Sequence, residues 1–200
     1  GQQQAQGLLI SPNGEIAVTG KTNSSWAAAN LLDYSGGEDA FVSALSASGA
    51  FLWNTYLGGT GNDQGTAIAV DSHGDFLVLG CSTSTWGSPI TAHSGSGDAF
   101  VAKINAQDGG MVWNTFIGGS GTDYGYALTL DPGDNLFITG YCSSPWGTPL
   151  HEHSGVDDLF IAVLSSSGLY YQHTFYGSND YDDARGIAIS PDQEALWVAG

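Results

Sequence analysis

Short apolar runs alternate with turn-forming residues along the whole chain. One stretch shows the pattern clearly, with four runs of five to seven residues at 66–70, 76–81, 99–104 and 111–117. Each run is rich in β-branched and aromatic residues and is bounded by Gly, Asp, Asn or Ser, which is typical of β-strands joined by turns. The segment 76–79 is continuously apolar rather than alternating, which predicts a strand buried on both faces.

The same pattern returns about every 60 residues. Glycines mark one position of the repeat and tryptophans mark another: Gly20, Gly80, Gly140 and Gly200, and Trp26, Trp86 and Trp146. The sequence Asp-Ala-Phe-Val at 39–42 returns at 98–101, and as Asp-Leu-Phe-Ile at 158–161. Short four-stranded sheets covered on both faces and repeated at this period are typical of β-propeller blades. We therefore predict an all-β fold made of blades with four antiparallel strands.

The repeat divides the chain into units of about 1–60, 61–120 and 121–179, followed by a partial unit, 180–200. Three blades plus two further strands fall short of the roughly four to eight blades with which propellers close. We expect the chain to be an open segment of a longer propeller, or to complete a ring with other chains.

Composition and charge narrow the range of functions. Thirty glycines and only 12% charged residues argue against a helical protein. Twenty acidic residues stand against three Lys and Arg, which gives a formal net charge of -17. So few bases exclude a nucleic-acid-binding surface and attraction to anionic membranes, whereas the acidity is compatible with cation binding. No apolar run approaches the roughly 20 residues of a membrane helix, so we predict no membrane span.

Cysteine is sparse and its state is left open. Cys81 and Cys142 are the two cysteines of the chain, and no C-x-x-C motif occurs. Neither a zinc ribbon nor a thioredoxin-type site is therefore indicated. In an oxidising compartment the pair could form one disulfide, but the sequence alone does not bring the two residues within bonding distance.

The repeat sequence resembles a known family. The segments that carry the resemblance are Thr55-Tyr56-Leu57-Gly58-Gly59, Asp63, Ala67-Ile68-Ala69-Val70-Asp71, Val78-Leu79-Gly80 and Gly97-Asp98-Ala99-Phe100-Val101-Ala102-Lys103. Together they are similar to the bacterial β-propeller repeat called SBBP. The resemblance implies a secreted or cell-surface bacterial protein and brings no catalytic residues. The chain departs from the pattern in the loops at 86–89 and 146–149, and in the last unit at 178–185.

Glycine-rich loops follow the fourth strand of each unit and offer candidate metal ligands. Residues 58–63 and 118–123 match the first six positions of the calcium nonapeptide G-G-x-G-x-D. One interpretation is a single-loop calcium site at Asp63 and at Asp123, with Asp182 and Asp183 as further metal candidates in the irregular last loop. The other is a turn whose glycines need positive φ and whose Asp accepts local backbone hydrogen bonds.

The loops between the second and third strands carry the remaining candidates, and we expect them to share a face with the glycine-rich loops. Trp86 and Trp146 could stack on sugars, or could pack between blades as large aromatic side chains usually do. His93 and His153 also lie 60 residues apart and are candidate ligand contacts; the segment His151-Glu152-His153 could bind zinc or copper. The alternative for both histidines is a solvated or hydrogen-bonded imidazole.

These observations favour a non-catalytic β-propeller module that is secreted or displayed on a bacterial surface. It would hold loops rigidly for a protein or glycan partner, or for further propeller blades, and calcium is the one cofactor that the sequence suggests. Two alternatives stay open: a self-assembling extracellular surface or filament subunit, and a propeller enzyme acting on polysaccharide. Catalysis has little support, because no G-x-S-x-G nucleophile motif and no phosphate loop before a helix occur.

Overall fold

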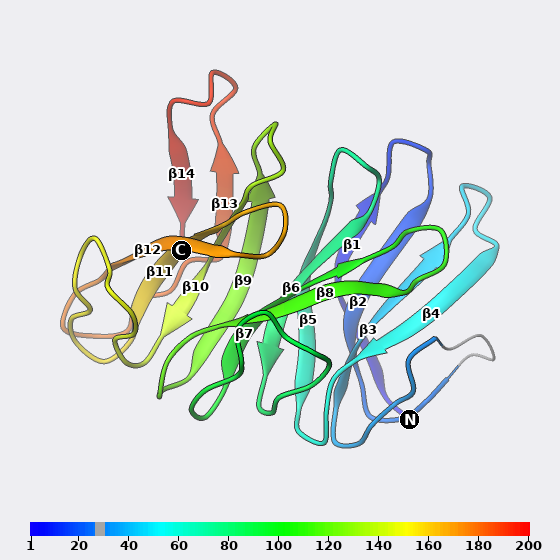
Figure 1. The fold of residues 1–200 in the computed structure, drawn as a ribbon, viewed down its shortest axis with the longest axis horizontal. Coiled ribbons are helices and arrows are strands. Elements are labelled where there is room, and N and C mark those ends of the chain that lie inside the picture. The colour runs from blue at the N-terminus through cyan, green and yellow to red at the C-terminus, as the bar shows by residue number, and fades with distance from the viewer. Residues whose placement is uncertain (27–30) are drawn as a thin grey trace.

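A computed structural model describes residues 1–26 and 31–200, and within these ranges the chain is all-β (Figure 1). The first sheet contains β1 (Gln3–Ile10), β2 (Ile16–Thr22), β3 (Asp39–Leu45) and β4 (Phe51–Leu57). The second contains β5 (Asp63–Val70), β6 (Phe76–Ser82), β7 (Asp98–Ile104) and β8 (Met111–Ile117). The third contains β9 (Asp123–Leu130), β10 (Leu136–Cys142), β11 (Asp158–Leu164) and β12 (Tyr170–Tyr176). A two-stranded sheet of β13 (Gly186–Ile189) and β14 (Leu196–Ala199) follows.

Each four-stranded sheet is an antiparallel meander in chain order, which confirms the predicted blades. The predicted strand boundaries agree with β6, β7 and β8 to within one residue. β5 begins three residues earlier than predicted, at Asp63. The reason is that β5 pairs with β6 from Asp63, opposite Ser82, before the apolar run begins. The amide of Asp63 also donates to the carbonyl of Glu38, just before β3.

The sheets lie side by side in chain order (Figure 1). The first strand of each sheet packs against the sheet before it: β5 contacts β1, β2 and β3, and β9 contacts β5, β6 and β7. β13 contacts β9 and β10 in the same way. The blades therefore contact their neighbours along one continuous series.

The continuous apolar runs are explained by burial on both faces. Every residue of β6 is buried. Phe76 and Val78 lie in the core between the first and second sheets, whereas Leu77 and Leu79 lie in the core between the second and third. Because successive side chains of a strand point to opposite faces, one strand supplies both cores and has no polar side.

The glycine that marks the 60-residue repeat has a packing reason. At Gly80, β6 passes the bulge in β5 where the register shifts between Gly65 and Ala67. A Cβ on Gly80 would overlap the carbonyl oxygen of Gln64 and lie 2.7 Å from the Phe100 ring. The bulge thus requires a residue without a side chain on the facing strand.

Candidate functional site

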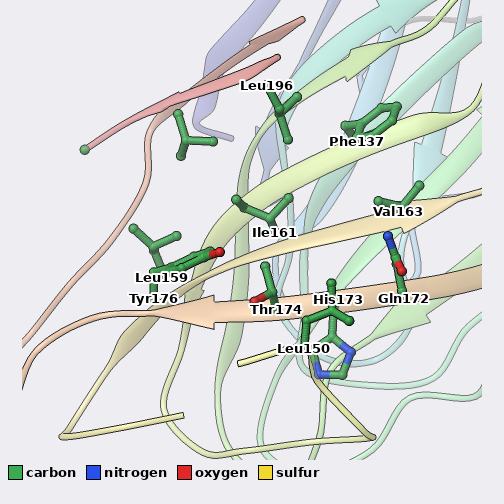
Figure 2. Close-up of a pocket in the computed structure, with 12 residues that line it drawn as sticks. Phe137, Leu150, Leu159, Ile161, Val163, Gln172, His173, Thr174, Tyr176 and Leu196 are labelled. Carbon is green, nitrogen blue, oxygen red and sulfur yellow. The ribbon is translucent and has the colours of Figure 1, made fainter. Parts of the chain in front are cut away.

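The third blade carries an apolar groove on the face that points away from the second blade (Figure 2). The cavity has a volume of about 590 Å³ and is lined by residues of β10, β11, β12 and β14 and by Leu150: Phe137, Leu150, Leu159, Ile161, Val163, Gln172, His173, Thr174, Tyr176, Leu196, Val198 and Gly200. In the second blade the positions equivalent to Phe137 and Ile161 are Leu77 and Val101, which are 1% and 0% exposed beneath the third blade. Apolar positions that are buried in the second blade thus line a groove in the third blade.

His173 lies beneath this groove and was missed by the sequence analysis. Its ring stacks on Trp146 with centroids 3.6 Å apart, and its Nε2 lies 2.8 Å from the Trp146 carbonyl oxygen. Its Nδ1 contacts the hydroxyl of Tyr170. The side chain is buried, and burial lowers the pKa of the imidazole, so the neutral form is favoured. In the second blade Asn114 holds the same position and donates to the Trp86 carbonyl at 3.0 Å.

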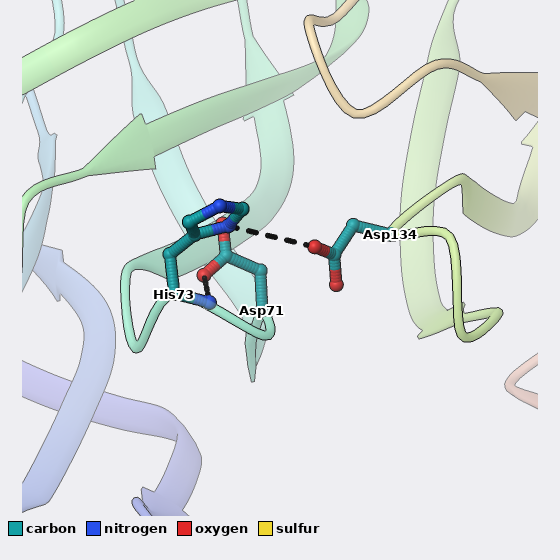
Figure 3. A group of neighbouring side chains, drawn as sticks. All are labelled: Asp71, His73 and Asp134. Atoms are coloured by element: carbon teal, nitrogen blue, oxygen red, sulfur yellow. Dashed lines mark hydrogen bonds and ion pairs between the residues drawn. The ribbon is translucent and has the colours of Figure 1, made fainter.

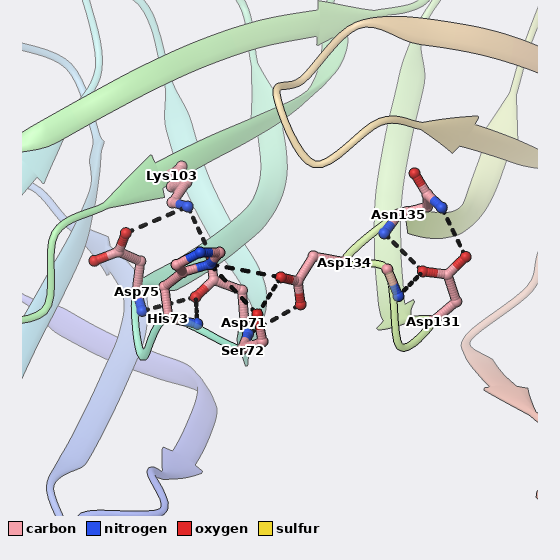
Figure 4. A network of polar contacts seen from close by, with 9 residues as sticks. Asp71, Ser72, His73, Asp75, Lys103, Asp131, Asp134 and Asn135 are labelled. Carbon is pink, nitrogen blue, oxygen red and sulfur yellow. Dashed lines mark hydrogen bonds and ion pairs between the residues drawn. The ribbon is translucent and has the colours of Figure 1, made fainter.

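Two hairpin turns, one from each of two neighbouring blades, meet in a polar cluster (Figures 3 and 4). Asp71, His73 and Asp134 form the one group of three metal-ligating side chains found in the described part of the chain. His73 Nδ1 lies 3.6 Å from Asp134 Oδ2, and the Ser72 amide donates to Asp134 Oδ1 at 2.9 Å. Lys103 Nζ lies 2.6 Å from Asp71 Oδ2.

The contacts of this cluster describe a clasp between blades rather than a metal centre. Both oxygens of Asp71 accept hydrogen bonds, Oδ1 from the amides of His73 and Asp75 and Oδ2 from Lys103. Burial opposes ionisation of Asp71, but the Lys103 ammonium and the backbone amides outweigh it and lower the pKa of this carboxyl. The cation that the carboxylate needs is already supplied by the chain.

A second set of carboxylates repeats at the junctions between blades. The Asp that begins the third strand of one blade lies beside the Asp that follows the next glycine-rich loop, and the pairs are Asp39 with Asp63, Asp98 with Asp123, and Asp158 with Asp182. The two segments of a pair run parallel and are joined through the backbone, as where the amide of Asp123 donates to the carbonyl of Gly97 at 2.7 Å. The sequence analysis named Asp63, Asp123 and Asp182 but missed their partners.

The first two pairs are fully buried, with each of the four residues at most 1% exposed. One oxygen of each carboxylate accepts from its own loop; Asp63 Oδ2, for example, accepts from the Gly59 amide at 2.9 Å. The Oδ1 atoms of Asp39, Asp63, Asp98 and Asp123 are buried without a hydrogen-bond donor. Burial, with the charge of the neighbouring carboxylate, raises the pKa of Asp63 to about 6 and that of Asp123 to about 7. The Ser82 side chain and the Gly59 amide oppose this rise at Asp63, and the Gly119 amide and the Trp146 side chain oppose it at Asp123.

The glycine-rich loops correct one part of the sequence analysis. The glycines at 58, 59 and 61 do not have positive φ, so a left-handed turn is not the reason for them. A Cβ on Gly58 would lie 2.6 Å from Asp63 Oδ2 and 3.1 Å from Asp39 Oδ1. Gly58 is required because the paired carboxylates lie against its Cα. The local hydrogen bond from the loop to Asp63 agrees with the prediction.

The two tryptophans lie in packed surroundings. Trp86 is 6% exposed, contacts Phe100 and Phe116 edge to face, and donates from Nε1 to Ser82. Trp146 is half-buried against His173. A sugar that stacked on either tryptophan would have to displace these contacts. They agree with the alternative prediction, in which the two tryptophans pack within the protein. The two loop classes do share a face, because the Gly61 amide donates to Ser84 Oγ at 3.1 Å.

The remaining predicted residues are also placed by local contacts. His93 and His153 are half-buried, and each directs Nε2 to a backbone carbonyl of its own blade, Ser82 at 3.1 Å and Cys142 at 3.2 Å. Asp183 forms an ion pair with Arg185 at 2.6 Å, so it does not share the site of Asp182.

Both cysteines are buried free thiols, so the structure contains no disulfide between Cys81 and Cys142. Burial raises the pKa of the Cys81 thiol to about 12, and the charges of Asp63, Asp98 and Asp123 act in the same direction. A thiol held neutral in this way is a poor nucleophile and a poor metal ligand.

Comparisons with known proteins agree with the fold. No protein-family model matches the sequence, so membership of the SBBP family stays a prediction. The chain is 25% identical over 198 residues to an uncharacterized WD repeat-containing protein, L264, of Acanthamoeba polyphaga mimivirus, a match that covers 83% of this chain and 14% of that protein. Hydrazine synthase of Kuenenia stuttgartiensis matches with a TM-score of 0.60 at 14% identity, over 96% of this chain and 48% of that one.

These matches support a β-propeller type of repeat. This chain spans only about a seventh of the viral protein and about half of the hydrazine synthase chain. In residues 1–26 and 31–200, no helix has the length and hydropathy needed to cross a membrane.

Proposed function

We propose that this chain is a rigid protein-interaction module of the β-propeller type, and that the groove on the third blade binds an apolar β-hairpin of a protein partner. The observation that supports it is the exposure of Tyr176 and Leu150, 48% and 67%, beside half-buried Leu159 and Ile161. Exposed apolar surface of this kind marks interaction sites.

The repeat indicates what kind of segment fits the groove. On the second blade the equivalent face is covered by the third blade, whose Leu136, Ile138 and Phe160 lie in the shared core. On the third blade β13 and β14 cover part of this face. A partner β-hairpin with alternating apolar residues would take the place of the two further strands of a complete blade. Gln172 at the rim supplies a polar side chain that can fix the strand's register.

A crosslinking experiment tests this function. A photoreactive residue at Leu150 should capture the partner, whereas the same residue at Val112, which is 54% exposed outside the groove, should not. With the purified partner, Leu150→Asp should weaken binding at least 10-fold and Val112→Asp should leave it unchanged. Equal binding by the wild type and Leu150→Asp would refute the groove as the binding site.

Self-assembly is a second candidate function with an observation of its own. The first blade carries another apolar cavity, of about 410 Å³, lined by Val18, Trp26, Phe41 and Phe51 among others. Apolar grooves on the first and the third blade can join copies of the chain head to tail. Native mass spectrometry over a concentration series would show a ladder of multimers under this function and a single monomer peak under the first.

We base the proposed cellular setting on charge and resemblance. A net charge of -17 and the similarity to SBBP repeats support a secreted or cell-surface module in a bacterium, stabilised by calcium. Fractionation of cells that express the tagged protein would test the location, with a cytoplasmic protein as the marker for lysis. Glycan binding by the loop face stays a prediction.

A further inference from the structure

The buried carboxylate pairs at the blade junctions have oxygens without a hydrogen-bond donor. Asp39 and Asp63 bring two acidic groups together at the first junction, and Asp98 and Asp123 do so at the second, all four at most 1% exposed. An unpaired buried charge or an unsatisfied buried oxygen costs free energy. The same arrangement occurs at two successive junctions, so the buried pair belongs to the repeat and is not an irregularity of one blade.

The chain supplies no cation to these pairs. Its three bases are committed elsewhere: Lys21 to Glu38 at 2.8 Å, Lys103 to Asp71 at 2.6 Å and Arg185 to Asp183 at 2.6 Å. His93 is the basic group that faces Asp63 and Asp98, and its Nε2 is directed at the Ser82 carbonyl instead. Cations or protons from solution are therefore left to balance these carboxylates.

At the first junction an unpartnered oxygen of one carboxylate lies beside the other carboxylate. Asp39 Oδ1 has no donor, and it lies against the Cα of Gly58 together with Asp63 Oδ2, within about 3 Å of the point where a Cβ would stand. At the third junction Asp158 Oδ1 and Asp182 Oδ2 lie against Gly177 in the same way. The absence of a side chain at this glycine leaves the carboxylates facing each other.

We propose that each of the two buried junctions binds one divalent, oxygen-preferring cation, with Asp39 and Asp63 as ligands at the first and Asp98 and Asp123 at the second. Carboxylate oxygens are among the ligands that Ca²⁺ prefers. Each ion joins consecutive blades, because its two ligands belong to different sheets. This inference deepens the calcium stabilisation proposed above and names its site.

The third pair is predicted to bind more weakly. Asp182 is half-buried, and its Oδ2 accepts from both the amide and the hydroxyl of Ser178, at 2.6 and 3.0 Å. Water can reach this carboxylate, so its charge needs less compensation. We expect two tightly bound ions per chain rather than three.

The test uses CaCl₂ alone as the probe. Native mass spectrometry and calorimetric titration of the EDTA-treated wild type should give two Ca²⁺ per chain. Asp39→Asn and Asp98→Asn should each remove one ion. Asp33→Asn, which removes the same charge from an exposed side chain, should keep both. Saturating Ca²⁺ should raise the Tm of the wild type by about 5 °C or more, an increase that each pair variant reduces.

The outcomes separate this proposal from the interaction function. A folded wild type that binds no Ca²⁺ at millimolar concentration, or variants that lose no ion, would overturn it, and the pairs would then hold protons. Should an Asn variant fail to fold, the stoichiometry and Tm shift of the wild type still decide. Binding of the protein partner through Leu150 is measured separately, so either function can fail alone.

Discussion

Single residues that break the repeat show where the blades differ. His173 replaces the asparagine of the second blade, Asn114, and keeps the same contact, a side-chain nitrogen on the carbonyl of the loop tryptophan. It adds a stacked ring and a titratable group beneath the groove. The exchange of one side chain thus turns a uniform structural position into a pH-sensitive one.

His173→Asn should reduce the acid sensitivity of the fold. The pKa of His173 is lowered by burial, so its contribution to stability is complete above the unfolded value of about 6.5 and is lost as the pH falls below it. Urea unfolding at pH 7.5 and pH 5 should show that the wild type loses more free energy of unfolding than the variant over this interval. Parallel pH profiles would contradict the assignment.

Lys103→Met should destabilise the Asp71 turn of the second blade, which carries the residues of the clasp, Ser72 and His73. It leaves the Asp71 carboxylate, 3% exposed, without its cation, which costs about 3 kcal/mol. Lys21→Met removes a lysine whose partner Glu38 is 39% exposed and should cost less than about 1 kcal/mol. Guanidinium unfolding of both variants measures the difference, and equal losses would mean that the Lys103–Asp71 pair contributes no more than a surface ion pair.

At the scale of elements, the sequence predicted the strands but not the contacts between neighbouring blades. The runs that became β6, β7 and β8 are apolar because the sheets are covered on both faces, so period and composition sufficed. The pairing of Asp39 with Asp63 joins a loop of one blade to the loop that begins the next, and no local pattern encodes that proximity. Positive φ was the wrong reason for Gly58, because crowding by a distant carboxylate leaves no local signal.

Gly58→Ala should therefore destabilise the first junction. Its Cβ would meet Asp63 Oδ2 at 2.6 Å, and relief of that overlap by shifting the carboxylates should cost about 1–3 kcal/mol. Gly97→Ala is the matched control, because its Cβ would have ordinary contacts of 3.6 Å or more and the equivalent residue of the third blade is Asp157. In thermal unfolding, the Tm of Gly97→Ala should equal or exceed that of the wild type, and the Tm of Gly58→Ala should be lower than both.

At the scale of the whole molecule, the blades form a series in which each contacts its neighbours. β6 supplies both cores, whereas β13 and β14 have four residues each, none of them buried, and pack through β13 on β9 and β10. In such arrays stability is distributed as a sum of unit and interface terms. The middle blade, with a core on each side, should be the last to open.

Hydrogen exchange can measure this order directly. Amides of β6 and β7 should exchange most slowly, and those of β13 and β14 fastest, since local opening requires little buried surface to be exposed there. Filling the third-blade groove with a partner hairpin should slow exchange in β11 and β12 while leaving β6 unchanged, because β6 contributes no residue to the groove. Uniform exchange rates across all blades would show that the chain opens as one cooperative unit, and the groove would then be as rigid as the core beneath it.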